Sequence, residues 1–145
     1  MTFPWYITAL SAALVWGIHY PLIGYALKKI SVFSVLFLTL IPLVFITPFF
    51  ANHLIHDYKI FTELETTVKL TILTIGLTSL LGSVLLFLSI ESKNATLTSL
   101  IEITYPVFVA LFSFFLFKHT HFNSSVILGG ILVIAGAGII ILNNH

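Results

Sequence analysis

Five long apolar stretches alternate with polar segments along the chain. The apolar stretches cover residues 3–27, 31–51, 68–90, 95–117 and 124–142. Each has about the 20 residues that a helix needs to cross a bilayer. Polar residues concentrate in the breaks, at 28–31, 52–67, 91–94 and 118–125. The pattern predicts an all-α membrane protein with five transmembrane helices, forming a single domain over residues 1–145.

The connection at 52–67 is the longest of the breaks, and it has a pattern of its own. The apolar positions that fall near helical spacing are Leu54, Tyr58, Phe61, Leu64 and Val68. Two interpretations stay open: a turn or two of amphipathic helix on the membrane surface, or a plain solvated loop. The other connections are short, which predicts antiparallel neighbouring helices.

Composition supports a membrane protein and excludes several functions. The chain is 59% hydrophobic and 8% charged, whereas a soluble domain needs a far more charged surface. It has no cysteine for disulfide or thiolate chemistry, and it has neither arginine nor a basic run, so nucleic acid is not an expected partner. No nucleophile–base pair or phosphate-binding loop occurs, so we expect neither an enzyme nor a bound cofactor. The first stretch lacks a basic n-region and is expected to remain as a spanning helix.

The lysines bear on orientation, because positive charge sets which way a membrane protein inserts. Five spans place the two termini on opposite sides. The side of the N-terminus has Lys59, Lys69 and Lys118, and the other side has Lys28, Lys29 and Lys93. This equal division favours dual topology, in which copies insert both ways. The alternative is a weak bias that the N-terminus or a partner resolves.

Two ionisable residues, His19 and Glu102, lie inside the predicted spans, where such residues are rare and usually functional. Both lie roughly 6 Å from the middle of the membrane, in the same half. Pro106 has no N–H to bond the carbonyl of Glu102, and lipid cannot replace that donor. Pro21 does the same to the carbonyl of Gly17, so both helices are expected to kink. The alternative is that Glu102 is a neutral, hydrogen-bonded packing residue.

These features predict a central cavity for a small-molecule substrate. Aromatic faces near the middle of the membrane would suit a cation, although core packing also explains them. A buried carboxylate that exchanges a proton suits a proton-coupled carrier. The predicted lining residues are Glu102, His19, Trp16, Tyr105, Pro106 and Tyr20.

Stripes of small and polar residues agree with a lined cavity. One predicted stripe has Ser99, Glu102, Pro106, Ala110 and Ser113, and another has Thr71, Thr74, Thr78, Gly82 and Ser89. The glycine-rich segment at 129–138 suits tight helix packing or a dimer face.

A rival group of metal ligands occurs in two connections on the side of the N-terminus. It comprises His53, His56, Asp57, His119 and His121. These residue types would suit zinc or iron. Their spacing matches no strong metal motif, however, so no metal site is predicted, and a membrane metalloprotein stays only an alternative.

Three segments carry a resemblance over nearly the whole chain. They are "LVWGIHYPLIGYALKKISVFSVLFL" (14–38), "FLSIESKNATLTSLIEITYPVFVALFSFFLF" (87–117) and "LGGILVIAGAGIIIL" (128–142). Their order and spacing resemble the EamA-like family of the drug/metabolite transporter superfamily. The resemblance implies ten helices built as two inverted five-helix repeats, and transport of small metabolites or drugs. This chain resembles one such repeat.

A single repeat cannot supply both halves, so the resemblance implies two paired chains. An antiparallel homodimer in a bacterial inner membrane, working by alternating access, is favoured because it agrees with the lysine count. A parallel dimer, a heteromer, a monomer and a non-transporting assembly subunit stay open. Two departures matter: Lys118 and His119 stand where the family often has Gly-Glu, and Thr39 to Pro42 occupies a region that often has an arginine. Roles of those family residues therefore cannot be carried over.

Overall fold

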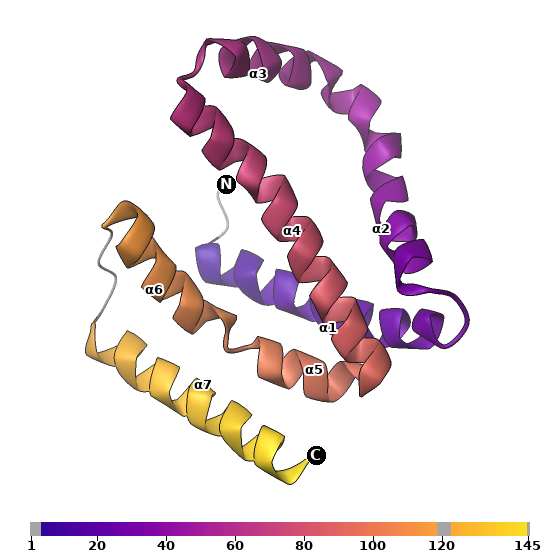
Figure 1. Cartoon of the computed structure of the whole chain (residues 1–145), viewed down its shortest axis with the longest axis vertical. Helices are drawn as coiled ribbons and strands as arrows, with labels where there is room; N and C mark the ends of the chain where they lie inside the picture. Colours follow the sequence, from indigo (N-terminus) through magenta and orange to yellow (C-terminus); the bar gives the residue numbers. More distant parts are fainter. Residues whose placement is uncertain (1–3, 119–122, 145) are drawn as a thin grey trace. The chain divides into compact units, whose positions relative to one another are not determined.

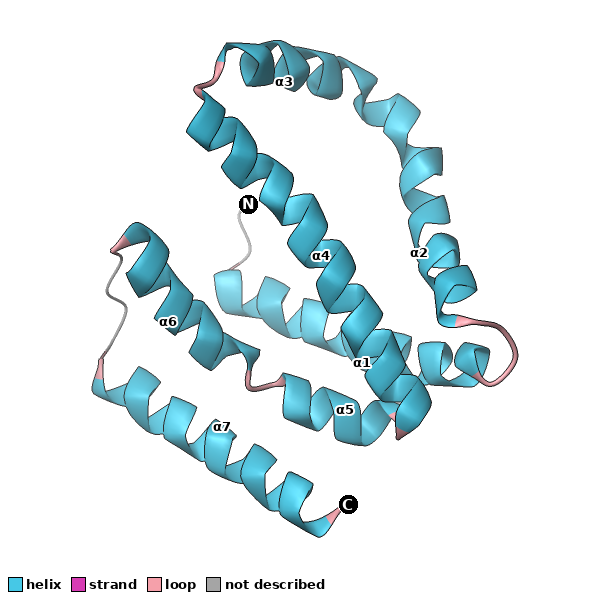
Figure 2. Ribbon diagram, viewed as in Figure 1, coloured by secondary structure: helices cyan, strands magenta, loops and turns pink. Residues whose placement is uncertain are grey.

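Helices joined by short turns make up the computed structural model, which describes residues 4–118 and 123–144 (Figures 1 and 2). In chain order the elements are α1 (Trp5–Leu27), α2 (Val32–Ile46), the 3-10 helix η1 (Thr47–Phe50), α3 (Ala51–Glu63), α4 (Thr66–Ser92), α5 (Ala95–Glu102), α6 (Tyr105–Phe117) and α7 (Ser124–Asn143).

The helices of the described residues confirm the predicted all-α membrane fold. Five helical stretches are long and apolar enough to cross a bilayer: Trp5–Leu27, Val32–Glu63, Thr66–Ser92, Ala95–Phe117 and Ser124–Asn143. They correspond to the five apolar stretches of the sequence, with one large difference. The second stretch continues as helix to Glu63, well beyond the predicted end at residue 51.

Polar side chains in the breaks begin the helices. The Asn94 side chain accepts a hydrogen bond from the backbone N–H of Leu97 at 2.8 Å, and Asn123 does the same for Val126 at 2.8 Å. Ser31 accepts from the N–H of Ser34 at 3.3 Å. Each cap satisfies a donor that the first helical turn leaves free. Short polar breaks therefore suffice to separate the spanning helices.

Threonines along α4 satisfy their hydroxyl groups within the helix. Thr71 donates to the carbonyl of Thr67, Thr74 to that of Leu70, and Thr78 to that of Thr74. Such bonds remove the need for a polar partner outside the helix, which is what an apolar environment demands. The threonine stripe can therefore face lipid or protein without a polar cavity.

The chain divides into two compact units, residues 1–21 with 93–145 and residues 22–92. The buried apolar side chains of the second unit come from the end of α1, the beginning of α2 and the end of α4. They are Ile23, Leu27, Val32, Val35, Phe87 and Ile90. In the described part of the first unit, Thr98 of α5 and Ala137 of α7 are buried, and α5 and α7 contact each other.

The long connection at 52–67 is mostly helical, which decides between the two interpretations of its sequence. Helix α3 covers Ala51–Glu63, and only Leu64 and Glu65 separate it from α4. In Figure 1, α3 bends away from the line of α2 and reaches the beginning of α4. The structure therefore has an additional helix here in place of a solvated loop.

Candidate functional site

The fourth spanning stretch is interrupted beside the buried acid. Helix α5 ends at Glu102, α6 begins at Tyr105, and Ile103 and Thr104 form a turn between them (Figure 2). Pro106 lies in the first turn of α6, a position where its missing N–H is not needed. The predicted kink at Pro106 is therefore a break into two shorter helices, and the predicted stripe from Ser99 to Ser113 does not run along one continuous helix.

The backbone of the break explains its position. The N–H of Ile103 bonds the carbonyl of Ser99 at 3.1 Å, and the N–H of Thr104 bonds that of Ile101 at 3.1 Å. The next bond, from Val107 to Thr104 at 3.0 Å, already belongs to the beginning of α6. The carbonyl of Glu102 would be bonded by residue 106 in a regular helix, and proline has no N–H to give. The interruption therefore leaves the backbone oxygen of Glu102 without this helical partner, next to the acidic side chain of the same residue.

Tyr20 reaches this point from α1. Its hydroxyl group donates a hydrogen bond of 2.5 Å to Oε2 of Glu102, and both side chains are half-buried. The two residues belong to the same compact unit. The sequence places His19 and Glu102 at the same depth, which permits a contact between them but does not predict one. The structure brings Tyr20 to the carboxylate.

The rings of Trp16, His19 and Tyr20 lie together on α1. Trp16 lies one turn earlier on α1, with its ring 5.6 Å from that of Tyr20 between centroids. The ring of His19 meets Trp16 edge-on at 5.1 Å. Residues three and four positions apart share one side of a helix, so the sequence already places these rings together. Tyr105, the first residue of α6, follows the break directly, and its side chain is exposed.

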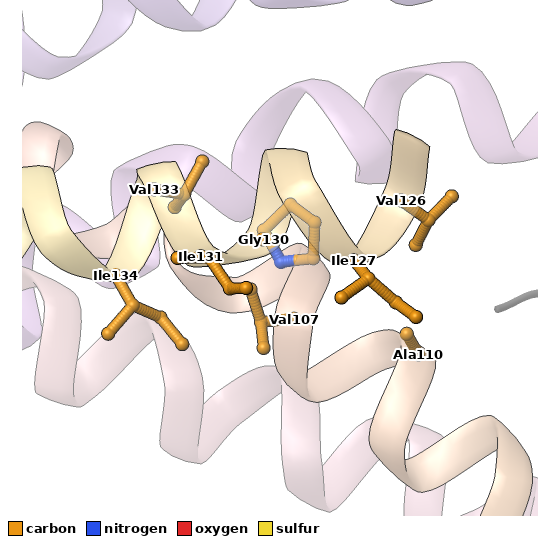
Figure 3. Close-up of a pocket in the computed structure, with 9 residues that line it drawn as sticks. Val107, Ala110, Val126, Ile127, Gly130, Ile131, Val133 and Ile134 are labelled. Atoms are coloured by element: carbon orange, nitrogen blue, oxygen red, sulfur yellow. The ribbon is translucent and has the colours of Figure 1, made fainter. Parts of the chain in front are cut away.

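A separate apolar pocket of about 270 Å³ lies between α6 and α7 (Figure 3). The two helices lie close together at Gly130, where a Cβ would stand 3.4 Å from a methyl group of Val107, an ordinary contact distance. Of the predicted site residues, the lining includes Pro106 alone. The lining residues are Pro106, Val107, Ala110, Val126, Ile127, Gly130, Ile131, Val133 and Ile134. Sequence reasoning missed this pocket because its apolar side chains resemble those of any lipid-facing helix.

The alternative metal site gains no support from the part of the chain that the structure describes. No three side chains of histidine, aspartate or glutamate gather there closely enough to hold a metal ion. His53, His56 and Asp57 lie exposed on α3. His119 and His121 lie outside the described residues.

The arrangement around Glu102 can bind a cation or a proton. Its carboxylate and the tyrosine hydroxyl can each accept a hydrogen bond, and the ring faces of Trp16 and Tyr20 attract positive charge. A carboxylate with one phenol partner keeps further lone pairs for a ligand. Interrupted membrane helices commonly supply such ion and substrate sites in transporters.

Comparison with known proteins agrees with this architecture. The family model of the EamA-like transporter family matches residues 3–142. No curated protein and no solved structure matches the chain. The family match and the five apolar helices support an integral, multi-pass membrane protein with the role of a transporter. The chain therefore belongs to the EamA-like transporter family.

Proposed function

We propose that the chain is half of a transporter that moves small, partly apolar cations or metabolites by alternating access, with proton coupling through Glu102. The observation that carries this proposal is the hydrogen bond from Tyr20 to Glu102, formed at the interruption between α5 and α6. An acid is costly inside a membrane, and a single phenol partner leaves it available to a ligand.

The coupling follows from competition at one carboxylate. A cationic substrate needs Glu102 charged, whereas the protonated acid is neutral and binds that substrate weakly. Proton and substrate therefore exclude each other at the same oxygen atoms. If the carrier reorients only when one of them is bound, the gradient of one drives the other.

Two copies are proposed to complete the transporter as an antiparallel homodimer in a bacterial inner membrane. The equal lysine count and the single five-helix repeat support this arrangement. Opposite insertion would place one Glu102 on each side of the membrane midplane, so that each half of the membrane has an equivalent acidic site. Rocking of one copy against the other would expose these sites alternately.

A transport assay on the chain alone tests the proposal. A panel of metabolites and organic cations is first screened for ligands that raise the melting temperature of the purified chain, since bound ligand stabilises by mass action. The strongest ligand is then followed into phosphatidylcholine liposomes under an imposed pH gradient. We expect uptake by the native chain, loss of gradient-driven uptake in Glu102→Gln, and unchanged uptake in Glu91→Gln. Glu91 is a suitable control because it lies exposed at the end of α4.

Two results would contradict the proposal in distinguishable ways. Undiminished gradient-driven uptake in Glu102→Gln would exclude proton coupling through this residue. Absence of uptake for every ligand in the panel, from a folded native chain, would instead favour a subunit that assembles with a partner and does not transport by itself.

A further inference from the structure

Helix α3 is too polar to lie within the hydrocarbon of the membrane. Its ionisable residues are His53, His56, Asp57, Lys59 and Glu63. The preceding helices already account for a complete crossing: the 15 residues of α2 span about 22 Å and the 4 residues of η1 about 8 Å. Their sum matches the roughly 30 Å of a bilayer core. The crossing is therefore complete at Phe50, the last residue of η1, and α3 begins at the next residue.

The chain changes direction at that point. Pro48 lies in η1, and the backbone of Phe50, with φ −109° and ψ 8°, leaves the helical region. Figure 1 shows α3 turned away from α2 and leading to the beginning of α4. A straight helix over Val32–Glu63 would be about 48 Å long, far more than the membrane core accepts. The bend turns α3 away from the direction of the crossing.

Connectivity excludes an upright α3. Its 13 residues span about 20 Å. Only Leu64 and Glu65 join it to α4, and two extended residues reach about 7 Å. Helix α4 has no charged residue between Lys69, in its first turn, and Glu91, so its membrane-crossing part has to start near the same membrane surface. Because both ends of α3 are tied to that surface, the helix has to lie along it.

A lysine stabilises the connection between the end of α3 and the beginning of α4. The ammonium group of Lys69, in the first turn of α4, donates a hydrogen bond of 2.8 Å to the carbonyl of Thr62 in the last turn of α3. This bond satisfies one of the carbonyls that the end of a helix leaves free. The N–H of Leu64 bonds the carbonyl of Phe61 at 3.3 Å and closes the turn. These two bonds therefore stabilise the turn between α3 and α4.

The side chains of α3 separate into two sides. At about 100° per residue, Leu54, Ile55 and Tyr58 fall on one side together with Ala51 and Phe61. Asn52, His53, His56, Asp57, Lys59 and Glu63 fall on the other. Two residues depart from this division, since Ile60 falls on the polar side and Thr62 on the apolar side. Leu54, Ile55 and Tyr58 are 51%, 58% and 68% exposed, so the protein leaves most of the apolar side open. An apolar side of this kind, held along a membrane surface, has the bilayer as its natural partner.

We propose that α3 is a membrane-surface helix whose Leu54, Ile55 and Tyr58 insert into the boundary between lipid headgroups and acyl chains. The tyrosine suits this depth because its ring is apolar and its hydroxyl group can bond the headgroups. Helix α3 has one lysine, one aspartate and one glutamate, so it carries no excess of positive charge. At neutral pH the insertion is therefore driven by the burial of apolar surface. Attraction to anionic lipid does not drive it.

Single cysteines test the proposal cleanly, because the natural chain has none. Nitroxide labels are attached to Leu54→Cys and Ile55→Cys on the apolar side, and to Asn52→Cys and His56→Cys on the polar side. The full chain is reconstituted in phosphatidylcholine vesicles, and the labels are probed by oxygen, which concentrates in lipid, and by a water-soluble nickel complex. Leu40→Cys, exposed within α2, provides the lipid-facing reference. Circular dichroism of each labelled variant checks that helix content is unchanged.

We expect the ratio of oxygen to nickel accessibility to be several-fold higher on the apolar side than on the polar side, and to stay the same when phosphatidylglycerol is added. Equal and high nickel accessibility on both sides would overturn the proposal in favour of a solvated helix. Low accessibility of the apolar side to both reagents would overturn it in favour of a protein partner. Lipid-like values on both sides would place α3 inside the hydrocarbon and contradict it too. These results do not depend on whether the chain transports.

Discussion

At position 102 a carboxylate lies half-buried in an apolar span, and the hydroxyl group of Tyr20 reaches it from a residue 82 positions away. Such a bond has two consequences. It partly offsets the desolvation of an acid in the membrane, and it holds α1 against the end of α5. The local sequence around Glu102 explains the broken backbone but not this partner, which depends on how α1 packs.

Replacing Tyr20 with phenylalanine removes the hydroxyl group and keeps the ring. We expect the variant to lose about 1 kcal/mol of unfolding free energy, the typical size of a hydrogen bond between membrane helices. The measurement is unfolding of the purified chain in detergent micelles. Tyr25→Phe is the matched control, because Tyr25 lies exposed in the same helix. Equal stability of the two variants would mean that the bond contributes nothing to the fold.

At the scale of elements, two prolines have different effects on their helices. The chain is interrupted between α5 and α6, whereas α1 is continuous. Both helices contain a proline that removes a backbone donor, Pro106 and Pro21. Helix α1 nevertheless runs through Pro21, whereas the chain turns at Ile103 and Thr104 before Pro106. A proline within an apolar stretch therefore predicts a weakened helix, and the surrounding structure decides whether it breaks.

Replacing Pro106 with alanine restores an N–H that can bond the carbonyl of Glu102. We expect α5 and α6 to join, which would slow amide hydrogen exchange at Ile103, Thr104 and Tyr105 in the reconstituted chain. Pro21→Ala provides the comparison, since α1 has no interruption to close and should change little. If exchange at these three amides stays as fast in Pro106→Ala, the break is held by tertiary packing and not by the missing donor.

At the scale of the whole molecule, the described part of the chain buries few of its large apolar side chains, and most of them are exposed. In water such a surface would aggregate, but in a bilayer it is the surface that lipid or another membrane helix covers. Several glycines of α7 have open space where a Cβ would stand, among them Gly129 and Gly136. Assembly with a second copy is consistent with both observations.

Cysteine labelling from the two sides of the membrane checks the proposed dual topology. A cysteine added after His145 and, in a separate variant, Asn52→Cys mark opposite sides of the chain. With antiparallel copies, an impermeant maleimide should label about half of each variant in intact cells and the remainder after permeabilisation, as equal lysine numbers predict. Complementary labelling, complete for one variant and absent for the other, would show a single orientation and exclude the antiparallel dimer.

The sequence by itself determined the class of fold, the five spans and the breaks between them. The reason is that a bilayer requires a certain length and hydrophobicity of each spanning segment by itself. The caps Asn94 and Asn123 likewise act within one helical turn, since each bonds a backbone N–H three residues later. It also located the acid and the proline in the fourth span. Only the structure decided that Tyr20 binds Glu102, that the kink is a break, that residues 51–63 form a helix, and that α6 and α7 line an apolar pocket. The bond and the pocket depend on contacts between distant segments, which a local pattern of polarity does not specify. The break and the helix at 51–63 are local, but the sequence pattern allowed a kink or a loop there as well.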